Sequence, residues 1–313
     1  MKQQKLQKLI VILGPTASGK SGLAYKLCKK FNGYIISADS RQFYKGLDIV
    51  TAKWSAQDSI IRKNNILYIN EIPHYLIDFL EPTNRFSAAE FQREVKKIIK
   101  TTEGAPFLVG GTGLYISAVI DNFRFPKGTP NSRVRKDFEQ KSTHELLDIL
   151  KQYDPESESK LRVERNKRRI VRAIEVCVTT GKPFSEQLVK GTPMYNTLQI
   201  GIKWDRQKLY ERINARADMQ MQLGLIQEIE TAYKKYPLAP ESFTAIGCKE
   251  FIPYMQGNIS LNEACEKHKQ NNRNYCLKQM RWFKRDPRIH WYEGPIDEHV
   301  YQNIAKRIQD FLG

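Results

Sequence analysis

A glycine-rich loop directly after an apolar run is the feature that most constrains how this chain can fold. Residues 14–21 read Gly-Pro-Thr-Ala-Ser-Gly-Lys-Ser, which matches the phosphate-binding loop G-x-x-x-x-G-K-[ST] at every specified position. The apolar residues 9–13 predict a buried strand before the loop, and Leu23, Leu27 and Phe31 recur at helical spacing after it. Strand, loop and helix in this order favour a phosphate site over a chance match in a glycine-containing turn.

Each part of the loop has a chemical task at such a site. Backbone N–H groups close around phosphate oxygens, and the helix that follows points the positive end of its dipole at them. Lys20 would neutralise phosphate charge, and Ser21 would offer its hydroxyl to Mg²⁺. The expected phosphate contacts are Gly14, Pro15, Thr16, Ala17, Ser18, Gly19, Lys20 and Ser21. The loop predicts a pyrophosphate-type ligand without defining the reaction.

A carboxylate follows the second predicted strand. Residues 34–37 are mostly apolar, and polar residues 37–42 cluster where that strand ends. Ligands of open α/β sheets sit at the carboxyl ends of the strands, so Asp39 is expected to face the same crevice as the loop. There it can hold Mg²⁺ through water or accept a proton from a nucleophile, or it can simply cap a turn.

A third strand, at residues 106–109, runs into a Gly-Gly-Thr-Gly turn and a helix. Thr112 therefore lies at a helix N-terminus, as a substrate contact or as a plain N-cap. Many nucleotide-hydrolysing proteins with this loop carry an acidic residue for Mg²⁺ at the end of such a strand, and this chain does not. That difference weakens the interpretation as a plain nucleoside triphosphate hydrolase.

The alternation of strands and helices predicts an α/β fold with a parallel sheet of the P-loop NTPase type. Pro126, Gly128 and Pro130 break the pattern, and strongly polar helical sequence follows. We therefore expect a first part of the core at 1–122, an inserted helical subdomain at 123–192 and a return to the core with C-terminal helices at 193–313.

Basic residues are in clear excess. Lys and Arg number 51 against 34 Asp and Glu, a net charge of +17, which suggests a polyanionic partner. Within a helix predicted from residue 160 to 178, arginines at 165, 168, 169 and 172 share one face, backed by apolar side chains. This stripe favours contacts with a phosphate backbone over an ordinary solvated face, which would mix charge signs. Arg212 and Arg216, one helical turn apart, are a candidate clamp for a pyrophosphate.

Nothing in the sequence predicts export or membrane insertion. The apolar run near the N-terminus has five residues, and no apolar stretch is long enough to span a bilayer. The five cysteines are far apart without a C-x-x-C pair, which predicts reduced thiols and a cytoplasmic protein.

Seven motifs in order along the chain resemble those of the tRNA isopentenyltransferase family, the tRNA dimethylallyltransferases. They lie at residues 14–21, 37–49, 51–53, 73–78, 109–115, 168–176 and 245–250. The resemblance covers essentially the whole chain. It implies transfer of a dimethylallyl group from dimethylallyl pyrophosphate to the exocyclic amine of the adenosine 3′ of the anticodon, in tRNAs that read codons beginning with U. The loop would then hold the donor's pyrophosphate with Mg²⁺, although motifs of this kind are also typical of ATP-binding proteins.

The resemblance also implies roles for single residues. Asp39 matches the family's general base, Thr112 a second catalytic position and Arg216 the arginine that steadies the leaving pyrophosphate. Because the adenosine lies inside a stacked anticodon loop, it must be flipped out to reach the carboxylate. The implied tRNA contacts are Asp39, Ser40, Arg41, Gln42, Thr112, Arg135, Arg168, Arg169, Ile170, Val171, Arg172, Thr244, Gly247 and Lys249.

The chain departs from the family pattern at Cys248, where relatives more often have Tyr. The zinc finger of eukaryotic relatives has no counterpart, so the form resembles the bacterial one, and we expect a monomer. Two alternatives remain open: an ATP-dependent small-molecule or nucleoside kinase with Asp39 as base, and a non-catalytic RNA-binding protein. The kinase leaves the basic insertion unexplained, and the binding protein leaves Lys20, Ser21 and Asp39 unexplained.

Overall fold

The computed structural model describes residues 6–55, 57–64, 66–126, 132–187, 189–237 and 242–313. These residues form two compact units, one of residues 1–120 and 194–313 and the other of residues 121–193. The second unit covers nearly the same residues as the inserted segment expected at 123–192.

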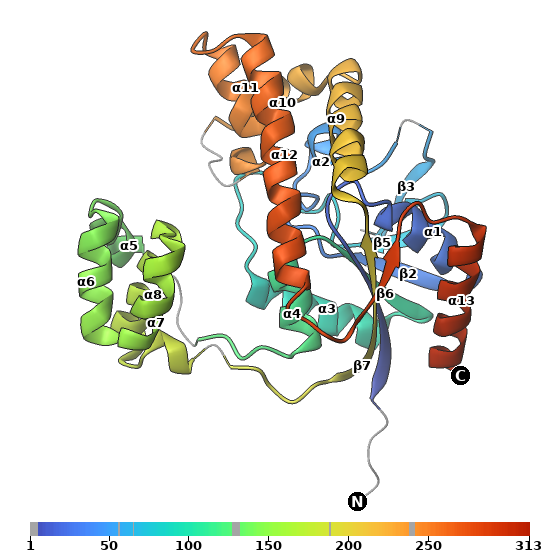
Figure 1. The fold of residues 1–313 in the computed structure, drawn as a ribbon, viewed down its shortest axis with the longest axis horizontal. Coiled ribbons are helices and arrows are strands. Elements are labelled where there is room, and N and C mark those ends of the chain that lie inside the picture. Colours follow the sequence, from blue (N-terminus) through green and yellow to red (C-terminus); the bar gives the residue numbers. More distant parts are fainter. Residues whose placement is uncertain (1–5, 56, 65, 127–131, 188, 238–241) are drawn as a thin grey trace, which may run out of the picture. The chain divides into compact units, whose positions relative to one another are not determined.

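An eight-stranded mixed sheet forms the centre of the first unit (Figure 1). Its strands are β1 (Gln7–Leu13), β2 (Gly33–Ser37), β3 (Ile60–Lys63), β4 (Ile66–Ile69), β5 (Ile72–Tyr75), β6 (Ala105–Gly110), β7 (Tyr195–Lys203) and β8 (Ile289–Glu293). They lie in the order β3-β4-β5-β2-β6-β1-β7-β8. The strands from β5 to β8 in this order are parallel, as the sequence predicts for the core, whereas β3, β4 and β5 pair antiparallel and make the sheet a mixed one at this edge.

Alternating side chains of the central strand β1 pack on opposite faces of the sheet. Leu9, Val11 and Leu13 belong to a core with residues of α3 (Ala88–Thr101) and α4 (Gly113–Ile120). Ile10 and Ile12 belong to a core with residues of α1 (Lys20–Lys30) and α13 (Glu298–Leu312). Helices therefore cover both faces of the sheet, which leaves the carboxyl edge of the parallel strands as the place for a site.

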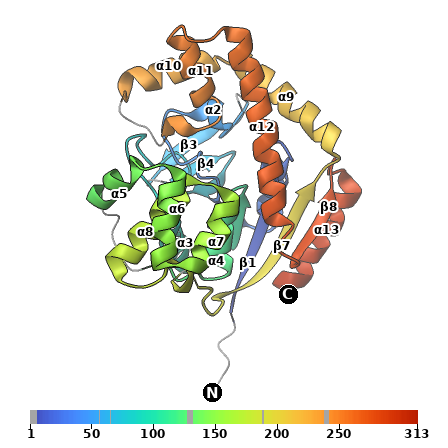
Figure 2. The same ribbon diagram turned by 60° about the vertical axis from the view of Figure 1, so that its left-hand side comes forward.

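Helices gather beyond that edge. They are α2 (Asp48–Thr51), α9 (Arg206–Gln222), α10 (Leu225–Lys235), α11 (Cys248–Met255) and α12 (Leu261–Phe283). Helices α9 and α12 lie side by side in both views (Figures 1 and 2). A core of their own joins α2, α10, α11 and the start of α12.

Two helix boundaries near the site have clear causes. Helix α9 ends at Gln222, and Gly224, with φ of 93°, starts α10. Residues 48–51 form α2, because the Glu228 carboxylate of α10 accepts hydrogen bonds from the N–H groups of Asp48, Ile49 and Val50 at 2.7–2.9 Å. A side chain about 180 positions away thus supplies the cap that the local sequence lacks.

The second unit is a small helical bundle. It consists of α5 (Ser132–Glu139), α6 (Thr143–Tyr153), α7 (Pro155–Glu164) and α8 (Lys167–Thr180), followed by the short 3₁₀ helix η1 (Phe184–Glu186). The helix expected from Lys160 to Val178 is broken: Arg165 adopts left-handed backbone angles with φ of 49°, and Asn166 caps the next helix. Arg165 therefore does not share a helix face with Arg168, Arg169 and Arg172.

Candidate active site

The phosphate-binding loop joins β1 to α1 in a conformation that leaves the helix N-terminus open. Ala17 and Gly19 have positive φ of 61° and 89°, and no side chain caps α1 among the described residues. Gly14 must be glycine, because a Cβ there would lie 2.8 Å from the carbonyl oxygen of Ile202. An uncapped N-terminus with free N–H groups is a ready site for an anion.

Side chains from three other elements fasten the loop. Arg216 of α9 donates to the Thr16 hydroxyl at 2.6 Å, and Arg212 donates to the Ala17 carbonyl at 3.0 Å. Trp204 Nε1, just after β7, donates to the Ser18 carbonyl at 3.0 Å. Gln279 of α12 accepts from the Thr16 N–H at 2.8 Å. The arginine pair singled out in the sequence thus reaches the loop, with Arg216 nearly buried around its guanidinium.

Asp39 is held beside the loop by pairing between β2 and β6. The Ala38 N–H donates to Val109 O at 2.7 Å, and the Thr112 N–H donates to Ala38 O at 3.1 Å. Asp39 follows directly, and its Oδ1 accepts from the Arg41 N–H at 3.1 Å. The residue is half-buried, so its carboxylate is fixed in orientation yet open to a ligand.

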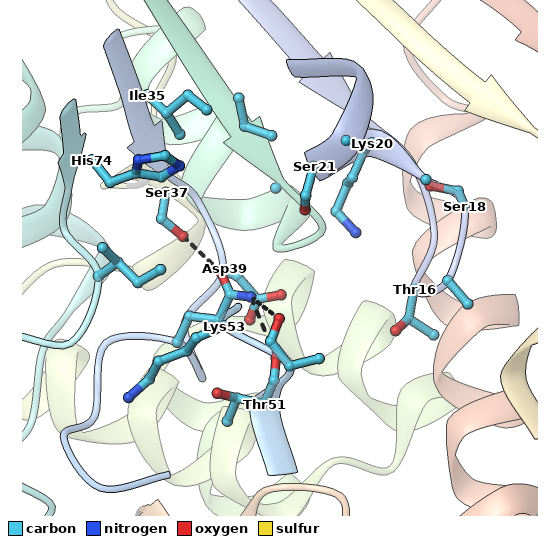
Figure 3. A pocket seen from close by; sticks show the side chains of 18 of the residues that line it. Thr16, Ser18, Lys20, Ser21, Ile35, Ser37, Asp39, Thr51, Lys53 and His74 are labelled. Atoms are coloured by element: carbon cyan, nitrogen blue, oxygen red, sulfur yellow. Dashed lines mark hydrogen bonds between the residues drawn. The ribbon is translucent and has the colours of Figure 1, made fainter. Parts of the chain in front are cut away.

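A cavity lies between the loop and Asp39 (Figure 3). The Lys20 ammonium and the Ser21 hydroxyl point into it from the loop, towards Asp39 on the opposite wall. Thr51 and Arg216 also line this cavity. Cations on one wall and a carboxylate on the other suit a phosphorylated ligand that reacts with a proton-bearing group.

Lys20 has an unusual electrostatic environment. Its surface borders the cavity, but protein atoms surround Nζ on most sides, and this desolvation lowers its pKa from 10.5 to about 8. The Asp39 carboxylate opposes the shift and the Arg216 guanidinium adds to it. Nζ donates to the Pro15 carbonyl at 3.3 Å. An anion that enters the cavity would stabilise the charged form of Lys20, which burial disfavours.

A second cavity meets the first at Asp39. The two share Thr16, Asp39 and Thr51 as lining residues. The other residues that line the second cavity are Ser40, Arg41, Val50, Thr244, Ala245, Ile246, Lys249, Asn271, Asn272, Asn274, Tyr275 and Lys278. It is polar and basic, and its floor is the face of α12 that carries Asn271, Tyr275 and Lys278. Asp39 thus stands between a cavity suited to phosphate and one suited to a larger polar, anionic partner.

The turn after β6 belongs to this junction. The Thr112 hydroxyl accepts from the Ser40 N–H at 3.1 Å, so Thr112 holds the segment that follows Asp39. The Gln42 carboxamide accepts from the Ser37 hydroxyl and donates to the carbonyls of Thr51 and Ala52. The Thr112 and Gln42 side chains thus hold backbone groups and neighbouring side chains of the junction in place.

Two polar residues of the first cavity are committed elsewhere. The Lys53 ammonium is buried in ion pairs with Asp48 and Asp78, both at 2.6 Å, and it points away from the cavity (Figure 3). His74 Nδ1 lies 2.8 Å from the Ile72 carbonyl, and burial lowers its pKa. Neither is available as a cation for a ligand near neutral pH.

Near α11, the structure separates three residues grouped in the sequence. Thr244 and Lys249 line the second cavity. Gly247 does not: it starts α11 with φ of 106°, and a Cβ there would lie 2.2 Å from Val50 Cγ2. Cys248 is fully buried, and burial raises the pKa of its thiol to about 12, so it is a packing residue.

In the helical unit, the predicted tRNA contacts differ in their availability. Arg135 and Arg172 pair with the buried Glu175 carboxylate at 3.0 and 2.7 Å, and Arg169 pairs with Glu164. Arg168 is exposed and has no ion pair among the residues that the structure describes. The charge of the arginine stripe on α8 is therefore partly neutralised by the Glu164 and Glu175 carboxylates.

Ile170 and Val171 were also expected to contact tRNA. Their side chains are 0 % and 4 % exposed and belong to the core of the helical unit. Because these side chains are buried, a tRNA contact at residues 170 and 171 would have to come from the backbone.

Three residues of the site were not identified in the sequence: Asn271, Asn272 and Gln279 on α12. One signal was present. Asn272 and Gln279 lie on one face of a predicted helix at a separation of seven, on the side where apolar residues are expected, and both are buried.

No group of three or more His, Cys, Asp or Glu side chains is placed to hold a metal within the described ranges. The oxygen donors at the loop, Ser21 and Asp39, suit Mg²⁺ only if a ligand's phosphate oxygens complete the coordination. No helix in the described part of the chain is long and apolar enough to cross a membrane.

Fold and site together define an α/β protein with a mostly parallel sheet, whose carboxyl edge joins a glycine-rich anion loop, a carboxylate and a basic cavity. A sequence model described as IPP transferase matches residues 42–286. The chain belongs to this family.

Similar proteins agree with this assignment. The chain is 40% identical to the tRNA dimethylallyltransferase of Halothermothrix orenii, over 97% of this chain and 93% of the relative. It is 38% identical to that of Anoxybacillus flavithermus, over 98% and 96%. The crystal structure of the tRNA isopentenylpyrophosphate transferase of Bacillus halodurans matches with a TM-score of 0.71 at 34% identity, covering 98% of this chain and 97% of that one.

Proposed function

We propose that this protein is a tRNA dimethylallyltransferase, which transfers the dimethylallyl group of dimethylallyl pyrophosphate to the exocyclic amine of the adenosine 3′ of the anticodon. The observation that carries the proposal is the position of Asp39, at the junction of the loop-lined cavity and the basic cavity. Family membership and the named relatives point to the same activity.

The loop-lined cavity takes the donor. The loop has the sequence of a P-loop NTPase, but the phosphate that it binds belongs to the leaving group of the reaction. The N–H groups at the start of α1, the Lys20 ammonium and the Arg216 guanidinium surround the pyrophosphate. The Ser21 hydroxyl would hold Mg²⁺, which would supply further neutralisation of the pyrophosphate charge.

The reaction is a substitution at carbon. The amine nitrogen of the adenosine attacks C1 of the dimethylallyl group, a C–N bond forms, and the bond from C1 to the pyrophosphate oxygen breaks. Asp39 accepts the proton that the amine loses. Lys20 and Arg216 stabilise the negative charge that develops on the departing pyrophosphate. The absence of an acidic residue at the end of β6 agrees with a reaction at carbon rather than hydrolysis.

The second cavity takes the flipped adenosine, and basic residues around it and on the helical unit take tRNA phosphates. Around the cavity, the tRNA contacts that we propose are Ser40, Arg41, Thr244 and Lys249. On the helical unit, we propose the exposed Arg168 as a direct contact to a tRNA phosphate. The proposed contacts Arg135, Arg169 and Arg172 are held in ion pairs, which a tRNA phosphate would have to share or replace. We expect a monomer that acts in the cytoplasm, where its tRNA substrate is.

The competing function is an ATP-dependent kinase, which the intact Lys20, Ser21 and Asp39 favour. One assay separates the possibilities. Purified protein is incubated with Mg²⁺, unmodified tRNA and either ¹⁴C-dimethylallyl pyrophosphate or γ-³²P-ATP. Label from the prenyl donor should enter tRNA with release of one pyrophosphate per transfer. Label transferred from ATP would establish the kinase, and tRNA binding without either transfer would establish a binding protein.

A further inference from the structure

Helix α12 carries one buried carboxamide that bridges the two halves of the active site. Gln279 is 5 % exposed. Its Oε1 accepts from the Thr16 N–H of the phosphate loop at 2.8 Å, and its Nε2 donates to the Gly111 carbonyl, just after β6, at 2.9 Å. Because one partner can only donate and the other can only accept, the orientation of the amide is fixed.

The turn after β6 is shaped to admit this side chain. A Cβ on Gly111 would lie 2.2 Å from Gln279 Nε2, so only glycine lets the carboxamide reach the carbonyl. A Cβ on Gly113 would lie 2.2 Å from the Trp282 ring, one turn further along α12. Gly111 and Gly113 therefore leave room for the Gln279 and Trp282 side chains of α12. This explains the Gly-Gly-Thr-Gly sequence after β6, which phosphate binding by the loop alone does not explain.

The bond from Gln279 changes what Thr16 can offer to a ligand. The Thr16 N–H is used by Gln279, and the Thr16 hydroxyl accepts from Arg216. Thr16 is therefore held from both sides, and it lines both cavities beside Asp39. Its position is set by α9 and α12 rather than by the loop itself.

Neighbouring residues on the same helix face support this arrangement. Tyr275, one turn before Gln279, lines the second cavity together with Thr16 and Asp39. Asn272 Oδ1 lies 3.4 Å from Arg216 Nη2. One rigid helix thus touches the loop, the β6 turn and α9.

We propose that Gln279 is a positioning residue for the transfer reaction: it holds the phosphate loop at Thr16 against the end of β6, and thereby sets where the donor's pyrophosphate sits relative to Asp39. The proposal rests on the proposed function for its reaction, but the hold on the loop can be measured without it.

The test compares Gln279→Met, which keeps the length of the side chain and removes both hydrogen bonds, with Gln270→Met, an exposed position on the same helix. Binding of inorganic pyrophosphate with Mg²⁺ is measured by calorimetry, and kcat and KM for dimethylallyl pyrophosphate by transfer to tRNA. Gln279→Met should weaken pyrophosphate binding and lower kcat/KM for the donor by about tenfold or more, with the KM for tRNA unchanged. Gln270→Met should behave as the wild type.

A second variant covers the case in which Gln279→Met fails to fold. A protonated Glu at 279 has one donor and one acceptor, as the amide does, whereas an ionised one opposes the Gly111 carbonyl. The activity of Gln279→Glu relative to wild type should therefore rise as the pH falls towards about 5.5. Asp39, Lys20, Arg216 and Tyr275 surround this region in both proteins, so their own titration cancels in the ratio.

The outcomes are distinct. Pyrophosphate binding and donor kcat/KM within twofold of wild type in Gln279→Met, even with a lower Tm, would overturn the proposal, as would a pH-independent ratio for Gln279→Glu. If the wild type transfers no dimethylallyl group yet Gln279→Met binds pyrophosphate more weakly, the proposed function fails and the hold on the loop stands.

Discussion

The lowered pKa of Lys20 makes donor binding depend on pH in a range where most lysines do not titrate. The charged ammonium binds the pyrophosphate, so affinity should be lost as the pH rises through the pKa of about 8 in the free protein. With that pKa, about nine-tenths of the molecules carry the cation at pH 7 and about one-tenth at pH 9, so the apparent Kd should rise about tenfold between them.

The assay is calorimetric titration with dimethylallyl pyrophosphate at constant Mg²⁺ from pH 7 to pH 9. The charge of the donor itself changes little in this range, because the last proton of a phosphate monoester leaves at about pH 6. The nearby Tyr275 does not interfere, since burial raises its pKa to about 12. Lys20→Arg is the matched control, because a guanidinium keeps its charge throughout and should give a flat profile. A flat profile in the wild type, or the same loss in Lys20→Arg, would refute the reasoning.

Three further changes test other parts of the account. Arg168→Ala should weaken tRNA binding and lower the slope of log K against log salt by about one, whereas Arg169→Ala, which removes an arginine already held in an ion pair, should change the slope less; equal slopes would contradict this. Arg216→Lys should lower kcat/KM for the donor about tenfold or more at saturating tRNA, because an ammonium cannot offer a pyrophosphate the planar set of N–H donors that a guanidinium has; wild-type kinetics would remove Arg216 from the site. Gly247→Ala should destabilise the fold by about 2 kcal/mol in thermal unfolding, since its φ is positive and its Cβ would meet Val50; an unchanged Tm would show that the turn can relax.

The sequence was sufficient where local pattern and tertiary structure agree. The loop at 14–21 is recognisable because its glycines, lysine and serine are needed at fixed spacing. The start of α3 is local in the same way: Ser87 and Glu90, three residues apart, form a capping box in which the Glu90 carboxylate accepts from the Ser87 N–H at 2.8 Å. Family membership, inferred from ordered motifs, is confirmed as well.

Elements whose cause lies elsewhere in the chain could not be read from the sequence. Strand β3 is exposed at all four residues, so its sequence, Ile-Ile-Arg-Lys, shows neither a buried apolar run nor the alternation of a half-buried strand. Helix α2 is capped by Glu228, and the Asp39 junction is completed by a face of α12 whose buried polar residues look misplaced until their partners are known. Ile170 and Val171 lie in the core of the helical unit, as their place behind the arginine stripe predicts, whereas a tRNA-contact motif does not indicate which of its side chains face outward.

The central claim is that Asp39 takes the proton of the attacking amine between two separate cavities. The most direct test is the single-turnover rate of dimethylallyl transfer by Asp39→Asn at saturating tRNA and donor, with the Kd for tRNA measured on the same protein. The amide keeps the size and the contact to the Arg41 N–H but cannot take the proton, so the rate should fall by about 10²–10⁴-fold with the tRNA Kd nearly unchanged. A rate within a few-fold of wild type would contradict the account, and so would a loss explained entirely by weaker tRNA binding.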